Sequence, residues 1–154
     1  MTANNHAESA SEKPPQPKPE TIPRPAPPVS ELSQGFWEAV ARKELAVQQC
    51  GACGTLRHYP QPLCPLCHSD DFDWASLSGR GEIYSYTVAH RAFHPAWKEH
   101  VPYAIATIEL EEGVRMVCDL LEIDPERVAI GQRVEVAFAE LPGQGWMPRF
   151  EVID

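Results

Sequence analysis

From residue 82 onward, apolar and polar side chains alternate in short runs, as they do in β-strands that bury one face. The turn Gly79-Arg80-Gly81 precedes the first run, Glu82–Ala89, whose faces are expected to carry Ile83, Ser85 and Thr87 on one side and Tyr84, Tyr86 and Val88 on the other. Tyr103–Leu110 is the second run, and its inward face holds Ala104, Ala106, Ile108 and Leu110. The two alanines suit the tightly curved interior of a small barrel.

Three further runs bring the predicted strands to five: Val114–Leu121, Arg133–Ala139 and Pro148–Ile153. In the fourth strand we expect Val134, Val136 and Phe138 to point inward. Glu111-Glu112-Gly113 predicts a hairpin turn, Asp124–Arg127 a short helical turn, and residues 141–146 a loop. Five strands with only a short helical turn between the third and the fourth favour a small closed barrel of the OB-fold type, and a small β-sandwich is the alternative.

The hydrophobic period changes upstream, where Ser33–Val47 is predicted to be a helix. Phe36, Val40 and Ala41, with Trp37 and Leu45 alongside, form a broad apolar stripe at helical spacing. Ser33 is the expected N-terminal cap. The two aromatic residues of the first turn either pack on the body of the chain or line a groove for a ligand or partner.

Residues 1–30 have the composition of a tail. Eight prolines fall between Pro14 and Pro28, and large apolar residues are scarce. Such a segment cannot bury enough surface to offset its chain entropy, so we expect disorder with local polyproline II character. A solvated linker is one interpretation, and a proline-rich docking ligand is the other.

Two matched cysteine pairs stand between the helix and the alternating region. Cys50 and Cys53 form the first Cys-x-x-Cys knuckle, and ten residues later Cys64 and Cys67 form the second. This spacing predicts a tetrahedral site of four thiolates, which is typical of structural zinc. The pattern also resembles rubredoxin, whose knuckles hold iron, so iron is the less favoured metal. Two disulfides, or four unrelated buried cysteines, are the alternatives.

The residues around the knuckles fit a metal module. Gly51 and Gly54 allow the backbone to turn its N–H groups toward sulfur, and Pro65 stiffens the second knuckle. Strands are expected at Thr55–Tyr59 and around Phe72 and Trp74. Two nearby histidines are expected to be bystanders because four thiols complete the coordination shell: His58 and His68.

The fold class is therefore mainly β, with an N-terminal helix, a rubredoxin-like zinc ribbon and a five-stranded OB-fold barrel. The expected parts are a disordered proline-rich tail (1–30), the helix (31–47), the zinc ribbon (48–75) and the OB-fold (76–154).

The connection between the first two barrel strands, residues 90–102, is long and rich in chemistry. It holds three of the six histidines, two aromatic residues and two bases. The bases and imidazoles could pair with phosphate, and the aromatic rings could pack on a base or an acyl chain. A surface loop folded on its own barrel is the alternative. The candidate binding residues are His90, Arg91, Phe93, His94, Trp97 and Lys98, together with Phe36 and Trp37 of the helix.

No catalytic constellation is evident in the sequence. Cys118 is the one cysteine outside the knuckles, and it lies within an apolar strand, where an inert thiol is expected. We therefore predict no catalytic residues.

Charge and hydropathy restrict the functional classes. The first 30 residues hold three acidic and three basic residues, so the net charge of −9 falls on residues 31–154. A surface this acidic repels a phosphate backbone, which argues against nucleic-acid binding. No apolar stretch is long enough to span a membrane, and the first thirty residues lack an apolar signal core. Thiols committed to a metal suit a reducing compartment, so a cytoplasmic location is expected.

Several motifs together resemble the acyl-CoA-associated zinc-ribbon/OB-fold family, which has a rubredoxin-like zinc ribbon and a C-terminal OB-fold. They are Phe36-Trp37-Glu38-Ala39, the four knuckle cysteines, Gly79 to Thr87, His90-Arg91 with His94-Pro95, Val101-Pro102-Tyr103 and Pro148-Arg149-Phe150. The resemblance covers residues 35–153.

The resemblance implies a partner role. Members of this family pair with thiolase-superfamily proteins, whose subunit holds the catalytic residues while the OB module helps to receive the CoA thioester. It implies a non-catalytic accessory subunit of an acyl-CoA thiolase or thiolase-like aldolase, within a hetero-oligomer, in steroid side-chain or aromatic-compound degradation. The alternative is a single-stranded nucleic-acid-binding module, because zinc ribbons and OB-folds also serve that use.

Overall fold

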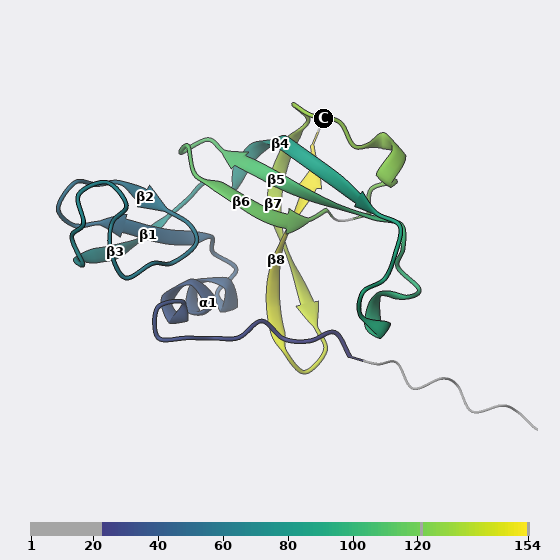
Figure 1. Cartoon of the computed structure of the whole chain (residues 1–154), viewed down its shortest axis with the longest axis horizontal. Helices are drawn as coiled ribbons and strands as arrows, with labels where there is room; N and C mark the ends of the chain where they lie inside the picture. The colour runs from purple at the N-terminus through teal and green to yellow at the C-terminus, as the bar shows by residue number, and fades with distance from the viewer. Residues whose placement is uncertain (1–22, 121, 154) are drawn as a thin grey trace, which may run out of the picture.

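The structure is a computed structural model that describes residues 23–120 and 122–153. Within these residues lie two antiparallel sheets and one α-helix (Figure 1). No helix in this part of the chain is long and apolar enough to cross a membrane. The tail predicted to be disordered comprises residues 1–30, and its residues 1–22 lie outside the described residues.

The N-terminal half consists of the helix and a small sheet. The helix is α1 (Gln34–Ala41), and it is followed by β1 (Ala46–Cys50), β2 (Leu56–Arg57) and β3 (Phe72–Ser76). These strands form a sheet in the order β2-β1-β3. β2 is shorter than the strand predicted over Thr55–Tyr59.

The C-terminal half is the predicted five-stranded barrel, nearly closed. Its sheet has the order β6-β5-β4-β7-β8, and Leu120, just after β6, forms a parallel bridge to Phe150 of β8, which brings the two edge strands together. Two short 3₁₀ turns, η1 (Pro95–Trp97) and η2 (Pro125–Arg127), interrupt the connections. The strands are β4 (Arg80–Ala89), β5 (Tyr103–Leu110), β6 (Arg115–Asp119), β7 (Arg133–Leu141) and β8 (Gly145–Val152).

The prediction of one helix over Ser33–Val47 was wrong at its C-terminal half. α1 ends at Ala41, Lys43 adopts a left-handed φ of 60°, and residues 46–50 all pair with β3. The apolar residues from Leu45 to Val47 are buried as part of the small sheet and not as a helical stripe. The Ser33 side chain does not cap α1, because its hydroxyl accepts a hydrogen bond from the Ser30 backbone N–H at 2.9 Å.

β4 departs from the predicted alternation because it contains a bulge. Its register against β5 shifts between Ile83 and Ser85. Ile83 is paired with Ile108, whereas Tyr86 and Val88 are paired with the inward Ala106 and Ala104. The bulge therefore places these three β4 residues on one face, and the prediction that Ser85 and Thr87 share the face of Ile83 was wrong.

Two further boundaries differ from the predictions. Gly81 belongs to β4 and not to a turn: it pairs with Leu110, and a β-carbon at Gly81 would lie 2.3 Å from the Glu109 carbonyl oxygen. Only the middle of the predicted loop over residues 141–146 is a turn (142–144), because the β7–β8 hairpin pairs as far as Leu141 and Gly145.

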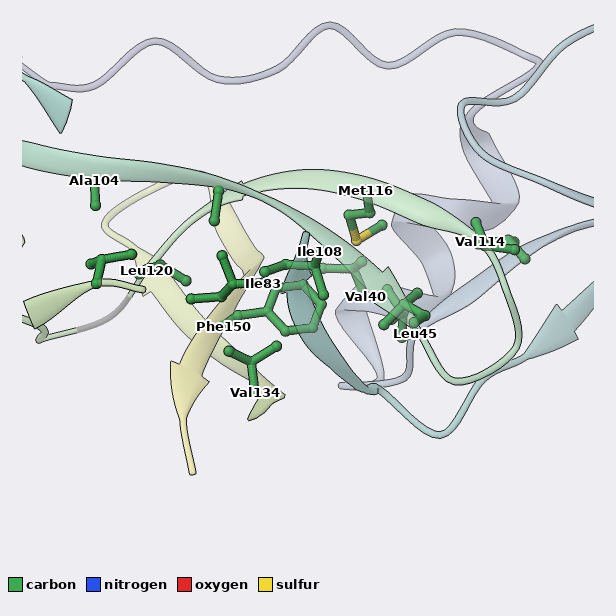
Figure 2. Packing of buried hydrophobic residues seen from close by; sticks show 14 of the residues in the cluster. Val40, Leu45, Ile83, Ala104, Ile108, Val114, Met116, Leu120, Val134 and Phe150 are labelled. Atoms are coloured by element: carbon green, nitrogen blue, oxygen red, sulfur yellow. The ribbon is translucent and has the colours of Figure 1, made fainter. Parts of the chain in front are cut away.

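One hydrophobic cluster joins the barrel to the helix and the small sheet (Figure 2). Ile83, Ile108, Val134 and Phe150 at its centre have no exposed surface. The inward face predicted for β5 is confirmed, since its four members are all at most 5 % exposed. The helix and the small sheet contribute to the same cluster through Phe36, Val40, Leu45 and Val47.

Candidate functional site

The four knuckle cysteines lie together at one end of the small sheet. Their sulfur atoms are all within 4.8 Å of one another, with Cys50 to Cys67 at 3.5 Å and Cys53 to Cys64 at 3.6 Å. Sulfur atoms around a tetrahedral zinc ion with Zn–S bonds of about 2.3 Å are separated by roughly 3.8 Å. The thiols are therefore positioned to bind one metal ion.

The two knuckles repeat the same backbone geometry. In each, the residue after the second cysteine donates its N–H to the carbonyl of the first: Gly54 to Cys50 at 2.9 Å, and His68 to Cys64 at 3.0 Å. Both residues are left-handed, with φ of 72° and 62°, a conformation that favours glycine. Gly54 thus turns the first knuckle through its left-handed conformation, with its N–H on a carbonyl and not on a sulfur, and His68 has the same backbone role in the second.

Backbone N–H groups favour negative charge on two of the sulfurs. The N–H groups of Cys67 and then Leu66 lower the pKa of the Cys64 thiol to about 6. The Cys53 N–H lowers the pKa of Cys50. At Cys67, the Ser69 N–H favours the thiolate, but the neighbouring thiols of Cys53 and Cys50 outweigh it and raise the pKa to about 12. A divalent cation bound among the four sulfurs would offset the repulsion between neighbouring thiolates, so the donor set fits a metal.

The alternatives to a metal site agree less well with the geometry. All five cysteines are free thiols, and sulfur separations of 3.5 and 3.6 Å are far longer than a disulfide bond of about 2.0 Å. Among the described residues, the group that could hold an ion contains the four cysteines and neither His58 nor His68.

A second feature is an apolar groove of about 730 Å³ beside the barrel. The helix contributes Phe36 and Trp37, the loop after β2 contributes Tyr59, and β5 and β6 contribute Tyr103 and Met116. Residues 24–30 form part of its wall. The groove is therefore assembled from segments that are far apart in the sequence.

The helix aromatics both pack on the body of the chain and line the groove. Phe36 is 6 % exposed and belongs to the hydrophobic cluster, and it also lines the groove. Trp37 is half-buried, and its ring meets that of Phe36 edge-on at 5.0 Å. The groove-facing residues Phe36 and His58 are also in contact, with ring centroids 5.3 Å apart.

The 90–102 loop contributes only part of its candidate residues to cavities. Trp97 lines the groove and stacks on Tyr103 at 4.9 Å. Lys98 lines a neighbouring cavity of about 800 Å³, next to the β7–β8 turn. The Nδ1 of His94 accepts a hydrogen bond from the Ala96 N–H at 3.2 Å, so this side chain caps η1.

The other candidates of the loop lie elsewhere. His90, Arg91 and Phe93 line neither cavity, and Phe93 is 88 % exposed. The structure thus brings together Phe36, Trp37 and Trp97 of the predicted set and leaves these three on the outside.

An ion pair that was not predicted from the sequence lies where the two cavities meet. Arg149 lines both cavities and is 2.6 Å from the Asp119 carboxylate, with both side chains about one-fifth exposed. Its Nη2 also donates to the Leu120 carbonyl at 3.4 Å. The neighbouring cavity has mixed charge, since Glu99 and Glu140 line it together with Lys98 and Arg149.

Cys118 lines the groove but is a poor nucleophile. Burial raises the pKa of its thiol to about 12, so the thiolate is scarce at neutral pH. Its nearest hydrogen-bonding partner is the Pro148 carbonyl, 3.9 Å away. This agrees with the prediction of an inert thiol.

Comparison with known proteins gives the family. Residues 37–73 match the family described as "ChsH2, rubredoxin-like zinc ribbon domain", and residues 74–139 match "ChsH2, C-terminal OB-fold domain". The chain belongs to the ChsH2 family. This confirms the resemblance drawn from the motifs, and the mainly β fold class with it.

Solved and curated ChsH2 relatives are similar over most of the chain. A chain of the structure titled "Ltp2-ChsH2(DUF35) aldolase" is 39 % identical, with a TM-score of 0.75 over 82 % of this chain and 98 % of that one. A Thermomonospora curvata protein named "Probable enoyl-CoA hydratase alpha subunit" is 40 % identical over 133 residues, 86 % of this chain. The "3-oxo-4,17-pregnadiene-20-carboxyl-CoA hydratase alpha subunit" of Mycobacterium tuberculosis is 41 % identical over 107 residues, 70 % of this chain.

The two hydratase subunits are matched over only part of their own length. This chain spans 41 % of the length of the first and 33 % of the second. The aldolase-associated chain, in contrast, is matched almost throughout.

Proposed function

We propose that this ChsH2-family chain is a non-catalytic accessory subunit of a thiolase-superfamily enzyme, either an acyl-CoA thiolase or a thiolase-like aldolase. The observation that carries the proposal is the match to 98 % of the ChsH2 chain in the Ltp2-ChsH2 aldolase, at 39 % identity. The partner subunit supplies the catalytic residues, and the two chains form a hetero-oligomer.

The accessory role is to help bind the CoA thioester. The names of both hydratase relatives specify CoA thioesters, and one of these carries a steroid acyl group. The apolar groove would receive the pantetheine arm or the acyl chain, against Trp97 and Trp37. Lys98 and Arg149 in the adjoining cavity would face the phosphate groups. We propose a substrate from steroid side-chain or aromatic-compound degradation, and the steroid acyl-CoA in the name of the Mycobacterium tuberculosis relative supports the first.

The outward residues of the 90–102 loop are assigned a different role. His90, Arg91 and Phe93 line neither cavity, and Phe93 presents an almost fully exposed ring. Exposed aromatic residues are typical anchors of protein interfaces. We assign these three side chains to the contact with the catalytic subunit.

The metal is assigned as structural zinc, held by Cys50, Cys53, Cys64 and Cys67. Four thiolate ligands leave no open coordination position, so the metal stabilises the ribbon and takes no part in the reaction. Its free energy of binding contributes to folding, because the small sheet is too short to bury a large core of its own. Reduced thiols around a metal also favour a cytoplasmic location.

The test is the affinity for an acyl-CoA thioester in the reconstituted complex with the catalytic subunit, measured by isothermal titration calorimetry. Trp97→Ala is expected to weaken binding roughly tenfold, because an aromatic packing contact contributes about 0.5–1.5 kcal/mol beyond its buried area. Tyr84→Ala is the matched control, because it removes an exposed aromatic side chain that lines neither cavity and has no assigned role in the contact with the catalytic subunit. Equal affinities in Trp97→Ala and the unmodified complex would contradict the assignment of the groove.

A further inference from the structure

The segment that leads into α1 lines one side of the apolar groove. Pro23–Ser30, which we term the strap, has no helix or strand, and it runs beneath α1 and past the β7–β8 hairpin toward η1 (Figure 1). Pro25, Pro27 and Pro28 line the groove, so the strap forms one of its walls.

The far end of the strap is held by one residue. The Arg24 guanidinium lies 4.1 Å from the centroid of the Trp97 ring, which itself stacks on Tyr103. The Gln144 side-chain amide, in the turn between β7 and β8, donates a hydrogen bond to the Arg24 carbonyl oxygen. Arg24 also lines both cavities, so this contact sits where they join.

The near end is anchored at the start of the helix. The Ser33 hydroxyl accepts from the Ser30 N–H at 2.9 Å, and the Ser33 N–H donates to the Ser30 carbonyl at 3.0 Å. These bonds fix the strap to α1 without involving the residues between its ends.

Between the two ends the strap is weakly held. Arg24 and Pro27 are half-buried, and its other six residues are exposed. A segment with so little buried surface opens locally at low free energy. Its four prolines keep it extended, so it would swing about Ser30 as one semi-rigid unit.

We propose that the strap is a hinged lid on the groove, latched by Arg24 against Trp97. The lid closes over an amphiphilic ligand that has an apolar body and an anionic end. The identity of that ligand as a CoA thioester rests on the proposed function above. Because the strap is a wall of the groove, opening it admits the ligand and closing it slows release.

The test compares binding kinetics of the isolated full chain and two variants, with anilinonaphthalene sulfonate as the fluorescent probe in stopped-flow measurements. This probe has apolar rings and one anionic group, and it does not depend on CoA. Arg24→Ala is expected to raise the dissociation rate constant about fivefold, the factor that corresponds to one exposed cation–π contact. A chain that begins at Val29 keeps the hinge, loses the lid, and is expected to raise both rate constants at least as much.

Arg42→Ala is the matched control, because this exposed arginine follows α1 and pairs with Glu44 at 3.3 Å, away from the latch. Rate constants that stay within twofold of the full chain in both test variants would overturn the lid. Absence of probe binding to the full chain and the shortened chain alike would overturn the groove as a ligand site. Because the probe contains no CoA, failure to bind a CoA thioester in the complex would refute the proposed function and leave the lid standing.

Discussion

At the scale of single residues, the metal centre depends on the few side chains and backbone positions that the two knuckles share. Each knuckle closes with a left-handed residue that donates its N–H to a cysteine carbonyl. The sequence marks this position in the first knuckle with Gly54. It does not mark it in the second, because His68 offers no such signal, and its role is visible only from its φ of 62°.

Loss of one thiolate should release the metal. Cys53→Ser leaves three thiolates within the cluster, and we expect zinc content to fall from one ion per chain to nearly none, with loss of near-ultraviolet circular dichroism from the ribbon. Structural zinc contributes on the order of 10 kcal/mol to folding in small modules, so the effect exceeds that of an ordinary point substitution. Elemental analysis and circular dichroism provide the measurements.

Cys118→Ser is the control, because this thiol lies outside the cluster and its raised pKa keeps it protonated. It should retain the full zinc content. Iron in the purified protein, or no metal in it, would contradict the assignment of zinc, and metal retained by Cys53→Ser would contradict the ligand set.

At the scale of elements, α1 is joined to the small sheet through His58, which follows β2 and packs against Phe36. Burial lowers the pKa of His58 from its usual 6.5 to about 4. The folded state therefore holds this imidazole neutral at pH values where the unfolded chain would protonate it.

The stability of the protein should reflect this difference. Between pH 6.5 and 4 the unfolded state binds more protons at His58, so the free energy of unfolding falls as the pH falls through this window. Because His58 is half-buried, we expect the free energy of unfolding to fall by about 2 kcal/mol, which is less than the full pKa shift implies. Urea unfolding of the unmodified protein and of His58→Gln across this pH range measures the loss. The variant lacks the contribution of the histidine, whereas release of metal in acid affects both proteins alike. The same dependence of the free energy of unfolding on pH in the two proteins would contradict the prediction.

The elements differ in how far the sequence predicts them. The alternation of apolar and polar residues is sufficient to predict the buried face of β5, because all four of its inward residues face one continuous core. It fails in β4, where the bulge between Ile83 and Ser85 changes the face, and a bulge has no period-2 signature. It fails again after Ala41, because Leu45–Val47 have an apolar pattern compatible with a helix, and only pairing with β3 decides their structure.

At the scale of the whole molecule, the ribbon, helix and barrel share one hydrophobic cluster, and the groove lies where they meet. The aromatic content of the helix and the 90–102 loop identified Phe36, Trp37 and Trp97 as candidates. The sequence does not predict that Arg24, Met116 and Arg149 line the groove, because their position there depends on contacts between segments that are distant along the chain.

The most direct test of the account is affinity purification of the tagged full chain from the organism that encodes it, with the co-purifying chains identified by mass spectrometry. The account predicts one thiolase-fold partner in a fixed stoichiometric ratio, and the pathway of that partner would then narrow the acyl group. A chain that purifies alone, or with nucleic acid, would contradict the role of accessory subunit.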